Sequence, residues 1–423
     1  MDGSPETLHI GNMRLPPEKP EPSTPPLAPT GYAVRVSIFF GALFLIYGVY
    51  LPYLPLWLKG QNLSVGQIAI ITATPYFLRD LVTPAVAFYA DRRGSHRRTI
   101  VMLAWIGVAA TLALSQMSGF WPILIFAVMT SIMMTTTMPL TEVIALHGMR
   151  TTGYDYGRVR LWGSLTFVAA NIGAAEVIAR TGSFSVVWML AAAFAMTLMA
   201  AHLLPTADRK TSHDAHTHAL SLGMAARLAV TPLFVLFLIA GGTVQAAHAT
   251  YYTFATLHWT SQGITPLIIG VLWALGVIAE VVLFAFSGRV VASIGIRGLL
   301  ITAAASAVIR WTAMSVDPPL WALFPLQLVH GLTFGAAHIA AIHFMSQAVP
   351  EKLAGTAQAL YASVGMGLAM AIATLISGIL YEHFAGGAYL GMAGLGTIGL
   401  VAALALARLW HGGHVIEFQD QRT

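Results

Sequence analysis

Cysteine is absent from the 423 residues of this chain, and charged side chains make up only 9% of it. The lack of cysteine excludes disulfide frameworks, thiolate metal sites and a cysteine nucleophile. The scarcity of charge excludes a set of soluble domains, which usually carry about a quarter of charged residues. Hydrophobic residues reach 57%, and the mean hydropathy is +0.73. Because the apolar runs are long and continuous rather than alternating, they exclude a transmembrane barrel and predict an all-α polytopic membrane protein.

Apolar stretches between turn residues predict twelve transmembrane helices in two pseudo-symmetric six-helix bundles. They lie at 35–58, 65–90, 98–117, 120–147, 158–180, 184–204, 228–256, 265–288, 297–315, 319–346, 354–381 and 388–409. The bundles are expected at 34–204 and 228–409, joined by a cytoplasmic linker at 205–227. The Pro-rich head at 1–33 predicts a disordered cytoplasmic extension, and the polar end at 410–423 predicts a cytoplasmic tail.

Basic residues are distributed very unevenly between alternate loops. If both termini are cytoplasmic, the outside loops hold only Lys59 and Arg180 of the 22 lysines and arginines, while Arg79 and Arg310 fall within spans. The positive-inside rule therefore predicts cytoplasmic termini for a multi-pass protein of the inner (plasma) membrane. This topology explains the net charge of +5 without any nucleic-acid partner.

Ionisable side chains inside a span are costly, so each is a functional candidate. They are Arg79, Asp80, Glu142, Glu176, Glu280 and Arg310, with Arg160 near the start of a span and His248, His330 and His338 inside others. Glu176 lies near the outer end of its span, where snorkelling explains it. Asp80 directly follows Arg79 and points about 100° away around the helix. Only one of these two side chains need therefore face a central cavity, and the alternative for Asp80 is a pairing with a neighbouring helix.

The loop after the second predicted span reads ADRRGSHRR at 90–98. It resembles the cytoplasmic motif of the major facilitator superfamily, Gly-x-x-x-Asp-Arg-x-Gly followed by basic residues, although Ala87 replaces the first glycine. The resemblance implies a cytoplasmic gate whose contacts break and reform during transport. Its expected members are Asp91, Arg92, Gly94, Arg97 and Arg98. The alternative is a basic loop that only sets topology.

A second resemblance covers nearly the whole chain between the tails. The run YGRVRLWGS at 156–164, preceded by PLTE at 139–142, is similar to the helix four–five region of the lactose-permease-like branch of this superfamily. Further similar stretches are AHATYY (247–252), LWALGVIAE (272–280), VIRW (308–311) and HGLTF (330–334). The chain is identified as a member of that branch, closest to 3-phenylpropionate/proton symporter-like transporters. The resemblance implies that Glu142 and Arg160, 18 residues apart, contact the substrate.

The resemblance also implies where a coupling proton binds. Glu280, Arg310 and His330 match its proton-coupling region, but Thr333 stands where lactose permease has its proton-accepting glutamate. Glu280 is therefore the expected carrier, with Arg310 modulating it and His330 and His338 assisting. The alternative is a static ion pair between Glu280 and Arg310 that only positions two helices. His330, Phe334 and His338 recur every four residues and should share one stripe of a helix.

Arginines combined with aromatic rings favour a small aromatic carboxylate as the solute. The expected substrate-binding residues are Arg79, Glu142, Arg160, His248, Tyr251, Tyr252, Trp273 and Phe334. A sugar, a nucleoside or efflux of a hydrophobic compound are the alternatives, and each aromatic ring is alternatively a packing residue. Direction of transport cannot be read from residues.

These features predict a proton-coupled symporter that works by alternating access. No Walker-type run supports a primary pump, and no His-Glu-x-x-His set supports an intramembrane enzyme. We expect no cofactor or metal beyond the proton as coupling ion, and we interpret His213, His216 and His218 as part of a solvated linker. The expected partners are a small solute, the proton and the bilayer, and the expected functional unit is a monomer.

Overall fold

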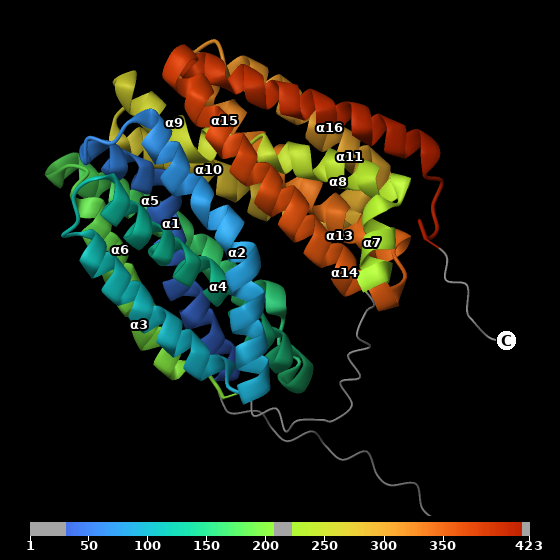
Figure 1. Cartoon of the computed structure of the whole chain (residues 1–423), viewed down its shortest axis with the longest axis horizontal. Helices are drawn as coiled ribbons and strands as arrows, with labels where there is room; N and C mark the ends of the chain where they lie inside the picture. The colour runs from blue at the N-terminus through green and yellow to red at the C-terminus, as the bar shows by residue number, and fades with distance from the viewer. Residues whose placement is uncertain (1–30, 207–221, 417–423) are drawn as a thin grey trace, which may run out of the picture.

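A computed structural model describes residues 31–206 and 222–416, and within them the chain forms helices and turns without any strand. The expected disordered head up to residue 30, most of the linker and the end of the tail lie outside these residues. The first half contains α1 (Tyr32–Gly60), α2 (Val65–Arg93), α3 (His96–Leu114), α4 (Phe120–Thr152), α5 (Tyr156–Thr181) and α6 (Ser185–Leu203). Figure 1 shows these six helices gathered into one bundle beside the helices of the second half.

The second half uses shorter segments, several of which join end to end. They are α7 (Leu222–Val230), α8 (Pro232–Ala246), α9 (Ala249–Ser261), α10 (Pro266–Ala285), α11 (Ser287–Met314), α12 (Leu320–Leu328), η1 (Gly331–Ala336), α13 (Ala337–Ala348), η2 (Glu351–Leu353), α14 (Ala354–Leu360), η3 (Tyr361–Leu368), α15 (Ala369–Phe384), η4 (Ala385–Ala388) and α16 (Tyr389–Leu409). The segments η1 and η3 are π-helical turns, which occur frequently at functional sites.

Ten stretches of the described residues are long and apolar enough to cross a membrane. The last of them, 351–409, contains two helices on either side of η4, and α2 matches α1 in length although it carries Arg79 and Asp80. When the last stretch is counted as two spans and α2 is added, the described residues contain the twelve expected transmembrane helices. Large apolar side chains lie exposed on their surfaces, including Trp105, Trp121, Ile309, Trp321 and Val401. Such a surface suits a lipid environment, so the prediction of a polytopic helical membrane protein is confirmed.

Local sequence explains where the helices begin and end. Ser64 caps α2 by accepting a bond from the Gln67 amide (3.2 Å), while the Gln67 side chain accepts one from the Ser64 amide (3.0 Å). Asp155 caps α5 by accepting from the Arg158 amide. At the other end of α2, Gly94 adopts φ +59°, the left-handed conformation that stops a helix.

The structure differs from the predicted spans at four places. The span expected at 228–256 begins at 232, ends at 261 and is broken after Ala246 into α8 and α9. Residues 222–227, assigned to the linker, begin the helix α7. The loop expected around 288–297 is helical on both sides of Gly295, whose φ of +68° makes a kink. The beginning of the predicted tail packs on the bundle, since Trp410 is buried and the Val415 amide donates to the Ala348 carbonyl (2.7 Å). Apolar side chains explain this packing.

One end of the molecule carries most of the described basic residues, and we call it the basic face. It holds the start of α1, the turns α2–α3 and α4–α5, the end of α6, and the corresponding parts of the second half. Its arginines and lysine are Arg35, Arg92, Arg93, Arg97, Arg98, Arg150, Arg158, Arg227, Arg289, Arg297, Lys352 and Arg408. Of the arginines and lysines in the described residues, only Lys59 and Arg180 lie on the opposite face.

Candidate functional site: a cavity between the two halves

A cavity of about 510 Å³ lies between the two halves of the protein. The first half lines it with α1, α2 and α4, and the second half lines it with α9, α14 and η3. The polar groups in its lining are Tyr47, Tyr50, Thr72, Tyr76, Arg79, Asp80, Thr83, Ser131, Thr135, Tyr252, Thr253 and Ser363. Its size is typical of a site for a small organic molecule.

Helix α2 supplies both charged groups of this lining. Thr72, Tyr76, Arg79, Asp80 and Thr83 all line the cavity, and their spacing places them on one broad side of the helix. Both Arg79 and Asp80 therefore line the cavity, although helix geometry required only one of them to do so. The long arginine side chain reaches back beside its neighbour, so Arg79 Nε lies 3.6 Å from Asp80 Oδ1.

The two halves make close contact on the side of the cavity nearer the opposite face. Asn171 Nδ2 of α5 donates to the Gly270 carbonyl of α10 (2.9 Å), and the Tyr53 hydroxyl of α1 donates to the Asn171 carbonyl (3.1 Å). Asn171 and Tyr53 are fully buried. A second contact joins α2 to α15, where a Cβ on Gly378 would lie only 2.4 Å from Ala69 Cβ. Toward the basic face, Pro84 of α2 and Ala359 of α14 both line the cavity.

Glu142 and Arg160 lie together in the first half, although neither belongs to the lining of this cavity. Arg160 Nε is 3.7 Å from Glu142 Oε1, and the Tyr156 hydroxyl donates to the same carboxylate. The guanidinium of Arg160 also stacks over the Phe44 ring at 4.2 Å. Phe44 contacts the cavity residue Tyr47, with ring centroids 5.1 Å apart. One layer of aromatic rings therefore separates the Glu142–Arg160 pair from the cavity.

Arg310 does not pair with Glu280, contrary to the expectation from the sequence. Arg310 is fully buried and donates to Gln327 Oε1 (2.9 Å) and Thr333 Oγ1 (3.2 Å), and it lies 3.0 Å from His330 Nδ1. None of the ion pairs in the described part of the chain includes Arg310 or Glu280. The reason is directional, because Gln327, His330 and Thr333 lie on one side of the neighbouring span and contact the two terminal nitrogens, while Arg310 Nε has no hydrogen-bond partner among the described residues.

Glu280 interacts electrostatically with Arg160 of the other half. It also interacts with the cavity residue Tyr252. Glu280 therefore interacts across the boundary between the halves, and it also packs on η1, where a Cβ on Gly335 would lie 3.8 Å from Glu280 Cγ. Arg160 has a carboxylate of its own half, Glu142, on one side and a carboxylate of the other half within electrostatic range.

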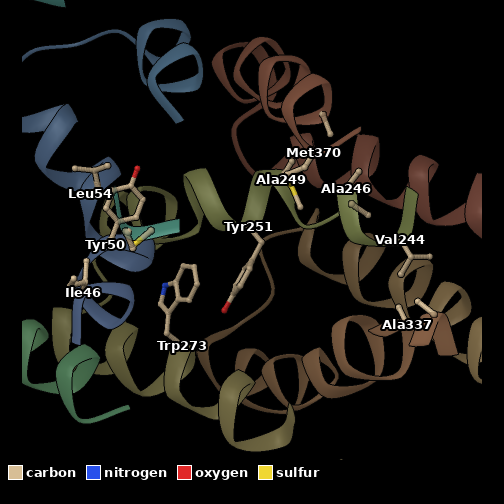
Figure 2. Close-up of a cluster of buried hydrophobic side chains, with 14 of the residues drawn as sticks. Ile46, Tyr50, Leu54, Val244, Ala246, Ala249, Tyr251, Trp273, Ala337 and Met370 are labelled. Carbon is tan, nitrogen blue, oxygen red and sulfur yellow. The ribbon is translucent and has the colours of Figure 1, made fainter. Parts of the chain in front are cut away.

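Two of the aromatic residues expected to bind the substrate, Tyr251 and Trp273, are buried. Tyr251 and Trp273 have ring centroids 4.6 Å apart, and Trp273 donates to Thr256 Oγ1 (3.0 Å). Figure 2 shows both rings in the buried cluster with the α1 side chains Ile46, Tyr50 and Leu54. Of the expected substrate-binding residues, only Arg79 and Tyr252 line the cavity.

The three expected histidines lie in and beside the buried Arg310 network. His248 Nε2 lies 3.0 Å from Thr333 Oγ1, which links the break between α8 and α9 to η1. His330, Phe334 and His338 stack along one stripe, with successive ring centroids 5.5 and 6.2 Å apart, as the four-residue spacing predicts. His338 Nδ1 is buried and has no hydrogen-bond partner among the described residues.

The expected gate lies on the basic face. Asp91 Oδ1 is 3.0 Å from His96 Nε2, so the histidine that departs from the family motif is its partner in this conformation. Arg97 donates to the His202 carbonyl and ties this loop to the end of α6. Arg92 and Arg98 are exposed. In the described residues no bond joins this loop to the second half.

The model of the MFS_1 like family matches residues 33–389, which is most of the chain. The chain belongs to this family. The "Probable 3-phenylpropionic acid transporter" of Escherichia coli (strain K12) is 29% identical over 85% of this chain and 93% of its own length. The "Maltose permease" of Geobacillus stearothermophilus is 28% identical over 89% of this chain and 96% of its own length.

Solved structures agree on the fold. The crystal structure of the nucleoside transporter NupG superimposes with a TM-score of 0.78 at 16% identity, covering 90% of this chain and all of that one. The inward-open structure of the xylose transporter XylE from E. coli gives a TM-score of 0.63 at 14% identity. Together with the family match and the curated relatives, this fold identifies the chain as a secondary transporter of the major facilitator superfamily.

Several cavity residues were missed by the sequence interpretation, notably Tyr47, Tyr50 and Tyr76. A signal was present for Tyr76. On α2, Thr72, Tyr76 and Thr83 lie at helical spacings from Arg79 and form a polar stripe in an otherwise apolar span. Such a stripe on a transmembrane helix indicates a surface that faces protein or water rather than lipid.

Proposed function

We propose that this protein is a proton-coupled symporter of a small aromatic carboxylate, of the phenylpropionate type, and that the solute binds in the cavity between the two halves. The observation that carries the proposal is the composition of the cavity lining. It combines one guanidinium, that of Arg79, with four tyrosine rings, those of Tyr47, Tyr50, Tyr76 and Tyr252. A guanidinium suits a carboxylate, and tyrosine rings suit a flat apolar body.

The contact between the halves supports transport by alternating access. Buried contacts close the cavity near the opposite face, whereas toward the basic face Pro84 of α2 and Ala359 of α14 line it from the two halves. Rocking of the two halves would reverse this arrangement around the same site. We propose that the basic face is cytoplasmic, because the positive-inside rule fits its charge, and that the protein lies in the inner membrane.

For the proton, we propose that Glu280 carries it. This carboxyl group lies at the boundary between the halves, within electrostatic range of Arg160. A group in this position can be neutral in one part of the cycle and charged in another, because rocking changes its distance from the cation. Glu142 and Arg160, joined to the cavity through Phe44 and Tyr47, are proposed to position the aromatic rings that hold the apolar body of the solute.

A sugar or nucleoside is the second candidate. Six hydroxyl side chains line the cavity beside the tyrosines. They are Thr72, Thr83, Ser131, Thr135, Thr253 and Ser363. These groups could bind solute hydroxyls. Relatives and fold neighbours whose names refer to maltose and to nucleosides favour this alternative too.

A binding comparison separates the candidates. The purified protein is titrated with 3-phenylpropionate, maltose and uridine, and the dissociation constant of each is measured by calorimetry. The proposal predicts that the carboxylate binds. Arg79→Gln should raise its dissociation constant by about tenfold or more, because a charge-assisted hydrogen bond is lost. The exposed Lys59→Gln is the matched control for loss of a positive charge. Binding of maltose or uridine in preference to the carboxylate would overturn the choice of solute.

A further inference from the structure

The Arg79–Asp80 pair is held loosely. Arg79 Nε lies 3.6 Å from Asp80 Oδ1, which is beyond a normal hydrogen bond, so attraction between the charges rather than a bond joins them. The guanidinium also lies over the Tyr76 ring, 5.6 Å from its centroid, and one terminal nitrogen lies 3.5 Å from the Met366 carbonyl. Both side chains are about a quarter exposed. Most of the donors of Arg79 therefore remain available to a molecule in the cavity.

The other two arginines within the membrane are already occupied. Arg160 lies between the Glu142 carboxylate and the Phe44 ring, outside the lining of the cavity. Arg310 is fully buried and directs its guanidinium at three neutral side chains. Arg79 is the one basic side chain in the described lining of the cavity.

A glycine of the second half leaves the room that the Asp80 side chain occupies. Its Oδ2 lies where a Cβ on Gly367 of η3 would come within 2.2 Å. In the described part of the chain, Arg79 is the cation that Asp80 contacts. Asp80 thus presents to Arg79 the same chemical group that an aromatic carboxylate would present. It does so at the point where the first half touches a π-helical turn of the second.

We propose that Asp80 is an internal substitute for the solute carboxylate: it occupies Arg79 when the cavity is empty, and the solute carboxylate displaces it on binding. The inference rests on the proposed function, because it names the group that receives the carboxylate. A buried or partly buried guanidinium without a counter-ion is costly inside a membrane. Asp80 supplies that counter-ion to the empty transporter, which must change conformation without solute. The solute supplies it to the loaded transporter.

Two probes of equal shape test this exchange, 3-phenylpropionate and its neutral amide, 3-phenylpropanamide. Removing Asp80 as a competitor should strengthen acid binding, so Asp80→Asn should lower the dissociation constant of 3-phenylpropionate by about two- to fivefold. Arg79→Gln should raise it by about tenfold or more, and Arg79→Lys should recover part of the loss. The dissociation constant of the amide should change by less than about twofold in all three variants, which also reports correct folding. Glu382→Gln, an exposed acid, is the control for Asp80→Asn.

A flux comparison tests the counter-ion role. In proteoliposomes, Asp80→Asn should retain exchange of internal for external 3-phenylpropionate, since both legs of exchange use the loaded transporter. Net uptake should fall, because the empty transporter must return with an unpaired guanidinium. A merely structural role for Asp80 would lower exchange and net uptake together, and that result would overturn the inference.

The outcomes separate the inference from the proposed function. If 3-phenylpropionate does not bind to the unaltered protein, both fail together. If it binds and Arg79→Gln does not weaken it, or Asp80→Asn weakens it instead of strengthening it, the exchange is overturned while the choice of solute stands.

Discussion

Gly270 provides the most direct test of the contact that closes the cavity near the opposite face. Its carbonyl accepts the buried bond from Asn171, and a Cβ at this position would lie 3.0 Å from Ala175 Cβ and 3.2 Å from the Tyr53 hydroxyl. Valine at position 270 would add a branched side chain where there is no room. Overpacking costs about 1–3 kcal/mol, and loss of the hydrogen bond adds about 1 kcal/mol.

Together these terms amount to about 2–4 kcal/mol against the conformation seen here. That is roughly a 30- to 700-fold shift of the conformational equilibrium toward states in which the halves separate on this side. The chain has no cysteine, so Ser363→Cys places a single reactive thiol in the cavity lining. A membrane-impermeant maleimide, added from one side at a time, then reports which face has access to the cavity.

We expect Gly270→Val to increase labelling from the opposite face by about tenfold or more, and to decrease labelling from the basic face. Gly173→Val on the neighbouring part of α5 is the matched control, because a Cβ there meets nothing within 4 Å. If Gly270→Val labels like this control, the Asn171–Gly270 contact does not hold the two halves together and the argument fails.

The remaining predictions concern the charged groups. Glu142→Gln and Arg160→Gln should each weaken solute binding by about tenfold, because each breaks the 3.7 Å pair beside the cavity; unchanged affinity in both variants would refute this role. Asp91→Asn should slow turnover and leave the dissociation constant unchanged, since the loop biases conformations without touching the solute; a loss of affinity with normal conformational exchange would contradict it. Glu280→Gln should abolish uphill accumulation and spare solute exchange, with Glu382→Gln as control. Uphill accumulation by Glu280→Gln would show that another group carries the proton.

The fold followed from the sequence because hydropathy and loop charge act over whole helices. Long apolar runs between turn residues located the twelve rods, and the asymmetry of arginine and lysine distinguished one face from the other. The break between α8 and α9 could not be predicted in the same way. No glycine or proline marks it, and it depends on contacts of His248 with η1 that join distant parts of the chain.

The site was predictable in its residue types but not in its pairings. Which neighbour a buried side chain meets depends on the rotation of each helix about its axis, and a single sequence does not contain that angle. Arg310 accordingly faces Gln327 and His330 instead of Glu280. The position of Asp80 was left open for another reason, because the angle between adjacent helical positions does not show how far an arginine side chain reaches.

Solute accumulation driven by a proton gradient tests the central claim most directly. Proteoliposomes with an imposed pH gradient, acidic outside, receive labelled 3-phenylpropionate, and protein-free liposomes correct for acid that crosses the bilayer unaided. The account predicts accumulation above the protein-free level that disappears when an ionophore collapses the gradient and that Arg79→Gln abolishes. Uptake that equals the protein-free level, or that is indifferent to both the gradient and Arg79→Gln, would contradict it.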